Sequence, residues 1–203
     1  MKLFASMNDL KPQQRKVSNR VTAAAAGLLG AVALASGIPA KAQGPTTNSV
    51  SDHHILVESL QNAGVTVVLN SPYYCDAETA GLYHSSARTL VVCQENATRP
   101  YADQGWTAYD LDTLRHEGHH VVQDCLAGAI GDSDFDALFN NERDFEEFVR
   151  GSLTENEIDW IIGSYAGEGE EVILHELEAF AAAKNVSPET IAEAIDNHCT
   201  FVF

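Results

Sequence analysis

The sequence predicts an α+β fold in which a small antiparallel or mixed sheet precedes a helical C-terminal half. Short segments rich in β-branched residues occur between residues 64 and 93, and from Tyr109 onward the hydrophobic residues follow a helical period. Strands followed by helices along one chain are typical of α+β domains. The 203 residues allow one such domain together with a processed segment.

The N-terminal segment, residues 1–42, has the three parts of a secretory signal peptide. It holds six of the twelve basic residues of the chain, followed by an apolar run over residues 21–40 and by Ala40-Lys41-Ala42. We therefore predict cleavage after Ala42, giving a periplasmic or secreted protein with no stable membrane association. The alternative is an uncleaved anchor, because residues 21–40 are just long enough to span a bilayer.

The charge balance excludes two classes of function. The formal net charge is −17, and removal of residues 1–42 leaves 161 residues with six basic and 28 acidic side chains. Nucleic-acid binding needs clustered Lys and Arg, and so does electrostatic binding to anionic membranes. We expect no nucleic-acid partner, and we expect most of the acidic side chains on a solvated surface.

The four cysteines all follow the predicted signal peptide. An even number of cysteines in an exported chain indicates two disulfides, for which three pairings are possible. Cys75 and Cys93 flank a predicted hairpin, whereas Cys125 and Cys199 each follow a predicted helix. We predict the pairs Cys75–Cys93 and Cys125–Cys199.

The predicted elements of the first half are short. Residues 43–52 are polar and contain Gly-Pro, which favours a flexible lead before the domain. A short amphipathic helix is expected over residues 53–62 and a strand over residues 64–70. Residues 81–84 and 89–93 read as two strands that pair with each other.

The second half of the predicted domain, which spans residues 53–203 in all, shows helix-start signals. Thr154 and Glu157 have the spacing of a capping box before an apolar helical stripe. Ser187 and Pro188 supply an N-cap and a proline at the first position of a final helix.

One motif carries chemistry: His116-Glu117-Gly-His119-His120, which has the pattern HExxH. On a helix, positions i and i+4 share a face, so His116 and His120 can point at one metal ion. Two imidazoles suit zinc, and Glu117 lies beside them, where it can act as general base towards water. His119 lies about 100° around the helix from His120, so we expect it at the rim of the site or packed.

A third metal ligand has to come from a later segment. The predicted helix over residues 170–183 carries Glu176 beside its apolar stripe, with alanines that allow a close approach of two helices. An acidic group on a buried flank is costly unless it is paired or bound to a metal. Helical geometry favours Glu176 over Glu178, because Glu178 is expected nearer the exposed side; the choice between the two stays open.

These two motifs resemble those of the gluzincin metallopeptidases, in which an HExxH helix and a glutamate from a later helix hold zinc. Glu176-Leu-Glu178-Ala-Phe-Ala is similar to the E-x-E-A or E-x-x-A element of small bacterial members. The resemblance implies a minimal zincin fold that holds one Zn²⁺ through His116, His120 and Glu176, with Glu117 as catalytic base. The N-E-x-x-S-D element of thermolysin-like members is missing, so their substrate-site residues are not carried over.

The same resemblance implies a peptide or protein substrate and an exported zinc peptidase. Tyr165, His175 and His119 are the candidate donors to a developing oxyanion. The strand near residues 88–93 is expected to pair with an extended peptide along its edge. Two alternatives remain: a zinc-binding protein without turnover, and a disulfide-stabilised interaction domain in which HExxH is a coincidence.

Overall fold

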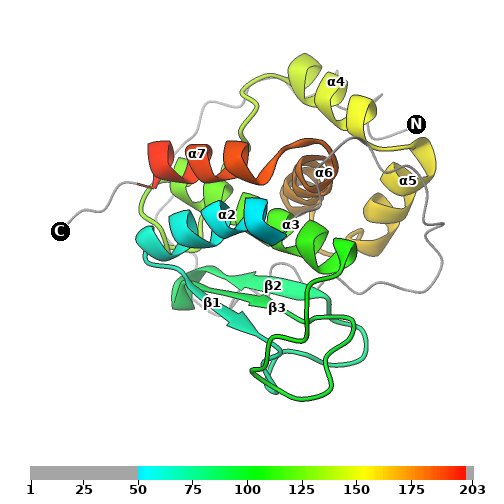
Figure 1. Cartoon of the computed structure of the whole chain (residues 1–203). Coiled ribbons are helices and arrows are strands. Elements are labelled where there is room, and N and C mark those ends of the chain that lie inside the picture. The colour runs from blue at the N-terminus through cyan, green and yellow to red at the C-terminus, as the bar shows by residue number, and fades with distance from the viewer. Residues whose placement is uncertain (1–49, 200–203) are drawn as a thin grey trace.

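The computed structural model describes residues 50–199, and within them the protein has the predicted α+β architecture (Figure 1). A three-stranded sheet lies at one side of the molecule, and helices account for most of the rest. The predicted signal peptide and residues 43–49 of the predicted lead lie outside the described residues. The first helix, α2, spans Val50–Asn62 and so begins three residues before the start predicted for it.

The sheet is mixed, with the strand order β1-β3-β2. β1 (Thr66–Leu69) runs parallel to β3 (Thr89–Val92), whereas β2 (Gly81–His84) forms the predicted antiparallel pair with β3. The expectation that the strand near residues 88–93 offers a free edge is wrong, because β3 is paired on both sides. The edges belong to β1 and β2. Sheet order depends on contacts distant in sequence, which short-range patterns do not encode.

Helices α2, α3 (Ala108–Ala127) and α7 (Pro188–His198) pack together over one face of the sheet. We call these helices and the three strands the sheet half. Thr107 and Asp110 form a capping box at the start of α3, and Ser187 caps α7 as predicted. The buried core of the sheet half includes Leu56, Leu60, Leu90, Leu114, Val122, Ile191 and Ile195.

The second group of helices, which we call the helical half, consists of α4 (Glu142–Ser152), α5 (Glu155–Ser164) and α6 (Glu170–Asn185). The predicted capping box of Thr154 and Glu157 starts α5. Both α4 and α5 pack on α6, and together they bury a separate apolar core of Phe145, Val149, Ile158, Ile161, Ile173 and Leu177. The main contact between the two halves is the one between α3 and α6.

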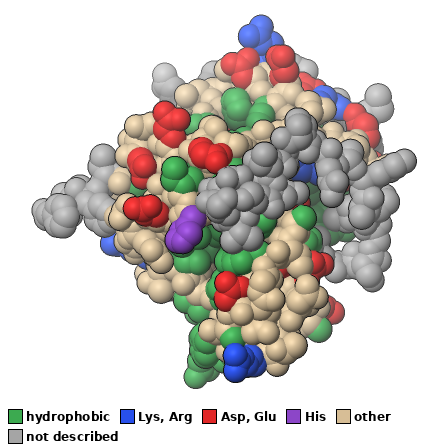
Figure 2. Space-filling model, viewed as in Figure 1, with side chains coloured by type: hydrophobic (Ala, Val, Ile, Leu, Met, Phe, Trp, Pro, Cys, Tyr) green, Lys and Arg blue, Asp and Glu red, His purple; other side chains and the backbone are tan. Residues whose placement is uncertain are grey.

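Both predicted disulfides, Cys75–Cys93 and Cys125–Cys199, are confirmed. Two disulfides indicate an oxidising environment of the kind that exported proteins meet. Among residues 50–199, no helix combines the length and the apolar character that crossing a membrane requires. The face in Figure 2 carries scattered acidic side chains and few basic ones, in keeping with the composition.

Candidate metal centre

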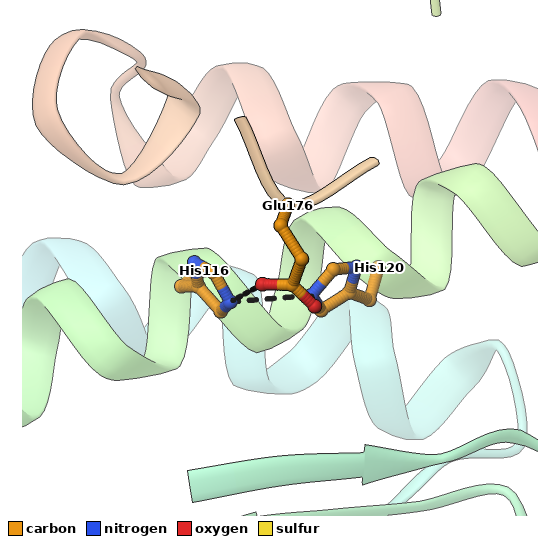
Figure 3. A group of neighbouring side chains, drawn as sticks. All are labelled: His116, His120 and Glu176. Carbon is orange, nitrogen blue, oxygen red and sulfur yellow. Dashed lines mark hydrogen bonds and ion pairs between the residues drawn. The ribbon is translucent and has the colours of Figure 1, made fainter. Parts of the chain in front are cut away.

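The three predicted ligands meet where α3 crosses α6 (Figure 3). The Nε2 atoms of His116 and His120 are 3.2 Å apart. The carboxylate of Glu176 lies between the two rings, with one oxygen 3.4 Å from Nε2 of His116 and the other 3.5 Å from Nε2 of His120. Tetrahedral zinc with bonds of about 2.0–2.1 Å separates neighbouring donor atoms by about 3.3 Å. The spacing of these atoms therefore fits a metal ion of that size.

All three side chains are buried, with exposures of 4% or less. Among residues 50–199, no donor of good hydrogen-bond geometry reaches either carboxylate oxygen of Glu176, and Nδ1 of His116 also has no partner there. Burial would raise the pKa of Glu176, but the nearby His120, His116 and Tyr165 outweigh it and lower that pKa. Burial lowers the pKa of His120 to about 4, although the charge of Glu176 opposes the shift, so this imidazole is neutral at ordinary pH. A buried carboxylate without a donor is costly, and a bound cation would compensate it. The donor set thus fits a metal, whose identity the structure does not show.

Glu117 is fully buried on the face of α3 that meets β2. Burial, together with the charge of Glu176, raises the pKa of Glu117 well above its ordinary value. Gly81 on β2 allows this approach, because a Cβ there would lie 2.6 Å from the Thr113 side chain and 3.3 Å from Cγ of Glu117. A larger residue would push β2 away from the helix.

The three candidate oxyanion donors have different surroundings. Tyr165 ends α5 and is buried, and its pKa is raised by burial and by the nearby charges of Glu176 and Glu117. His119 instead lies with Nε2 3.2 Å from Glu178. The ring of His175 is half-buried, and its centroid lies 6.1 Å from that of Phe135. Tyr165 therefore lies close enough to both Glu176 and Glu117 for their charges to act on its hydroxyl.

The helical position of Glu178 predicted that its side chain lies near the exposed side of α6. This prediction is wrong, because Glu178 is fully buried. Its carboxylate accepts hydrogen bonds from Gln123 and from the backbone N–H groups of Leu138 and Phe139. Burial alone would raise the pKa of Glu178, but His119 and these donors outweigh it and lower the pKa below its ordinary value. The loop that carries Leu138 and Phe139 covers this side of α6, which helical periodicity cannot reveal.

Gln123 was not singled out from the sequence. Its Oε1 lies 2.8 Å from Nδ1 of His120, so it contacts the ring nitrogen of this proposed ligand that is not the one near Glu176. The available signal is its position three residues after His120, which places both side chains on one face of the helix.

Comparisons with protein-family models, with curated proteins and with solved structures return no match. The resemblance to the gluzincin metallopeptidases therefore rests on the residues of the two motifs alone.

Proposed function

We propose that this protein is an exported zinc-dependent hydrolase of minimal zincin form, a peptidase that acts on peptide or protein substrates. The observation that carries the proposal is the convergence of His116, His120 and Glu176, with Glu117 next in sequence to His116 and close enough to Glu176 for the charge of Glu176 to raise its pKa. Two imidazoles and one carboxylate are a donor set that catalytic zinc sites use, with a fourth position left for water. The described residues bring together three such groups, whereas structural zinc sites have four protein ligands as a rule.

In this proposal, His116, His120 and Glu176 hold the ion, which supplies Lewis acidity and lowers the pKa of water. Glu117 takes the proton from the attacking water and passes it to the leaving amine. Burial and the charge of Glu176 raise the pKa of Glu117, so its carboxylate accepts a proton more readily than an exposed one would. The hydroxyl of Tyr165 donates to the oxyanion that forms on the scissile carbonyl.

The substrate is proposed to lie along β2. This strand is an edge of the sheet and is the one whose Gly81 lies against Glu117. An extended peptide paired with that edge would present its carbonyl groups to the site through main-chain hydrogen bonds.

The test is peptide hydrolysis by the zinc-loaded protein. We expect cleavage of members of a broad peptide library, and we expect Glu117→Gln to lower kcat by about 10²–10⁴-fold while zinc stays bound. Glu171→Gln, an exposed position at the start of α6, is the control and should keep full activity. A zinc-loaded protein that cleaves nothing, or that is indifferent to Glu117→Gln, would exclude the peptidase.

The second candidate is a zinc site that holds the fold together without turnover. One observation favours it: every proposed ligand is buried, and together they join α3 to α6 across the contact between the two halves. Stoichiometric zinc in a protein without hydrolytic activity, with loss of stability on chelation, would be its signature.

A further inference from the structure

A chain of buried polar side chains leads from α6 through α3 to one of the proposed ligands. Glu178 Oε2 accepts a hydrogen bond of 2.7 Å from Nε2 of Gln123, and Oε1 of Gln123 lies 2.8 Å from Nδ1 of His120. Glu178 and Gln123 are both fully buried. Neither faces the centre of the proposed metal site, so both are unassigned by the proposed function.

The surroundings of Gln123 fix which way its amide points. Its Nε2 has two neighbours, the carboxylate of Glu178 and the backbone carbonyl of His175, at 2.7 and 3.1 Å. An ionised carboxylate and a carbonyl oxygen can only accept hydrogen bonds, so the group between them has to be the NH₂. The carbonyl oxygen of the amide therefore faces His120.

An amide oxygen beside Nδ1 of His120 selects the tautomer of that ring. Oxygen is an acceptor, so Nδ1 has to carry the proton, and Nε2 is left with a lone pair. Nε2 is the atom that lies 3.5 Å from Glu176, in the proposed site. We propose that Glu178 and Gln123 are positioning residues that hold His120 as the Nδ1-protonated tautomer, ready to bind a metal through Nε2. This inference rests on the proposed metal site.

Glu178 is itself held from the other side. Its second oxygen accepts hydrogen bonds from the backbone N–H groups of Leu138 and Phe139, at 2.9 and 3.3 Å, and His119 lies 3.2 Å from Oε2. Because backbone donors cannot reverse their polarity, the carboxylate has to present an acceptor to the loop as well as to Gln123. A glutamine at 178 would satisfy the loop with its oxygen and turn its NH₂ towards the NH₂ of Gln123. Either orientation of Gln123 then faces a like group, its NH₂ against the NH₂ at position 178 or its oxygen against the backbone carbonyl of His175. The amide is therefore no longer held in one orientation, and the flipped form presents NH₂ to His120 and places the ring proton on Nε2.

The test compares three variants in the metal-free protein and in metal titrations. Long-range ¹H–¹⁵N correlation spectra report which nitrogen of His120 carries the proton, and chelator competition gives the Kd for Zn²⁺. In the unaltered protein we expect the proton on Nδ1. Glu178→Gln should give a substantial population protonated on Nε2 and should raise the Kd by about 10- to 100-fold. Gln123→Met removes the acceptor beside Nδ1 of His120 and should have the same two effects. It provides the test if Glu178→Gln does not fold.

Gln94→Met is the matched control, because Gln94 is also a buried glutamine, and its amide bonds Asn70 and Asp103 instead. It should leave both the tautomer and the Kd unchanged. A proton on Nε2 in the unaltered protein would overturn the proposal, and so would a Glu178→Gln variant with unchanged tautomer and Kd. If the unaltered protein binds no zinc, the proposed function fails, yet the spectra of the metal-free protein still decide the tautomer.

Discussion

The sheet half of the molecule carries both disulfides, whereas the helical half contains no cysteine and meets the sheet half chiefly where α6 packs on α3. Each half has its own apolar core. The contact between them is instead rich in buried polar groups: His116, Glu117, His119, His120, Gln123, Glu176 and Glu178. Buried charges stabilise a contact only when they are compensated. We therefore expect a bound cation to stabilise the contact between the two halves, where no disulfide links them.

The largest expected effect comes from opening the disulfide between α3 and the end of α7. Cys125–Cys199 closes a loop of 74 residues, and Cys75–Cys93 one of 18. Loop-closure entropy then predicts a loss of about 4.5 kcal/mol for Cys125→Ala/Cys199→Ala and about 3 kcal/mol for Cys75→Ala/Cys93→Ala. Urea unfolding of the two double variants measures both losses. A larger loss for Cys75→Ala/Cys93→Ala than for Cys125→Ala/Cys199→Ala would show that the link between α3 and α7 is not the main covalent stabilisation of the sheet half.

Metal removal should separate the two halves. Zinc at 100 times its Kd would stabilise the protein by about 2.7 kcal/mol. The two tryptophans report on different halves, since Trp106 packs against the core of the sheet half and Trp160 against that of the helical half. Each single variant keeps one tryptophan: Trp106→Phe keeps Trp160, and Trp160→Phe keeps Trp106. In the presence of chelator, we expect the thermal unfolding followed by Trp160 to have a lower midpoint temperature than the unfolding followed by Trp106. With zinc, the two thermal transitions should coincide. Unfolding midpoints that are the same with and without zinc would contradict a stabilising metal ion between the two halves.

Gly81→Ala tests the packing of β2 on α3. The added Cβ has no room between Thr113 and the backbone of Val91, so we expect a loss of about 1–3 kcal/mol in unfolding free energy and a lower rate of the proposed hydrolysis, because β2 holds the proposed base Glu117. Gly163 of α5 provides the contrast in the helical half, because a Cβ there meets nothing within 4 Å. Gly163→Ala should stabilise by about 0.5–1 kcal/mol. Chemical unfolding of both variants measures the two changes in unfolding free energy. Equal losses in Gly81→Ala and Gly163→Ala would contradict the predicted close packing at Gly81.

The smallest effect is the pH dependence of the ion pair between Glu157 and Lys184, which ties α5 to α6. Burial would raise the pKa of Glu157, but Lys184 and Thr154 outweigh it and the pKa is lowered. A lowered pKa contributes stability above the unfolded value, about pH 4.3, and that stability is lost as the pH falls through the folded value. Glu157→Gln should cost at most about 1 kcal/mol at pH 7 and nothing at pH 3. Unfolding at both pH values checks this, and an equal loss at pH 3 would assign the effect to packing.

Local rules carried much of the prediction. Helical spacing predicted His116 and His120 on one face, and capping signals predicted the starts of α5 and α7. The predicted hairpin and helices next to the cysteines indicated both disulfides. What failed depends on distant contacts. The central position of β3 follows from its pairing with β1, and the burial of Glu178 follows from the loop at Leu138 and Phe139. No periodicity within a single helix or strand encodes either contact.

The central claim is that His116, His120 and Glu176 bind one zinc ion, and a zinc titration of the metal-free protein tests it most directly. We expect one equivalent of zinc bound per chain. Glu176→Ala should lose that binding, whereas Glu171→Ala, the control on the same helix, should keep it. A protein that binds no zinc, or a Glu176→Ala variant that binds it as tightly as the unaltered chain, would contradict the claim.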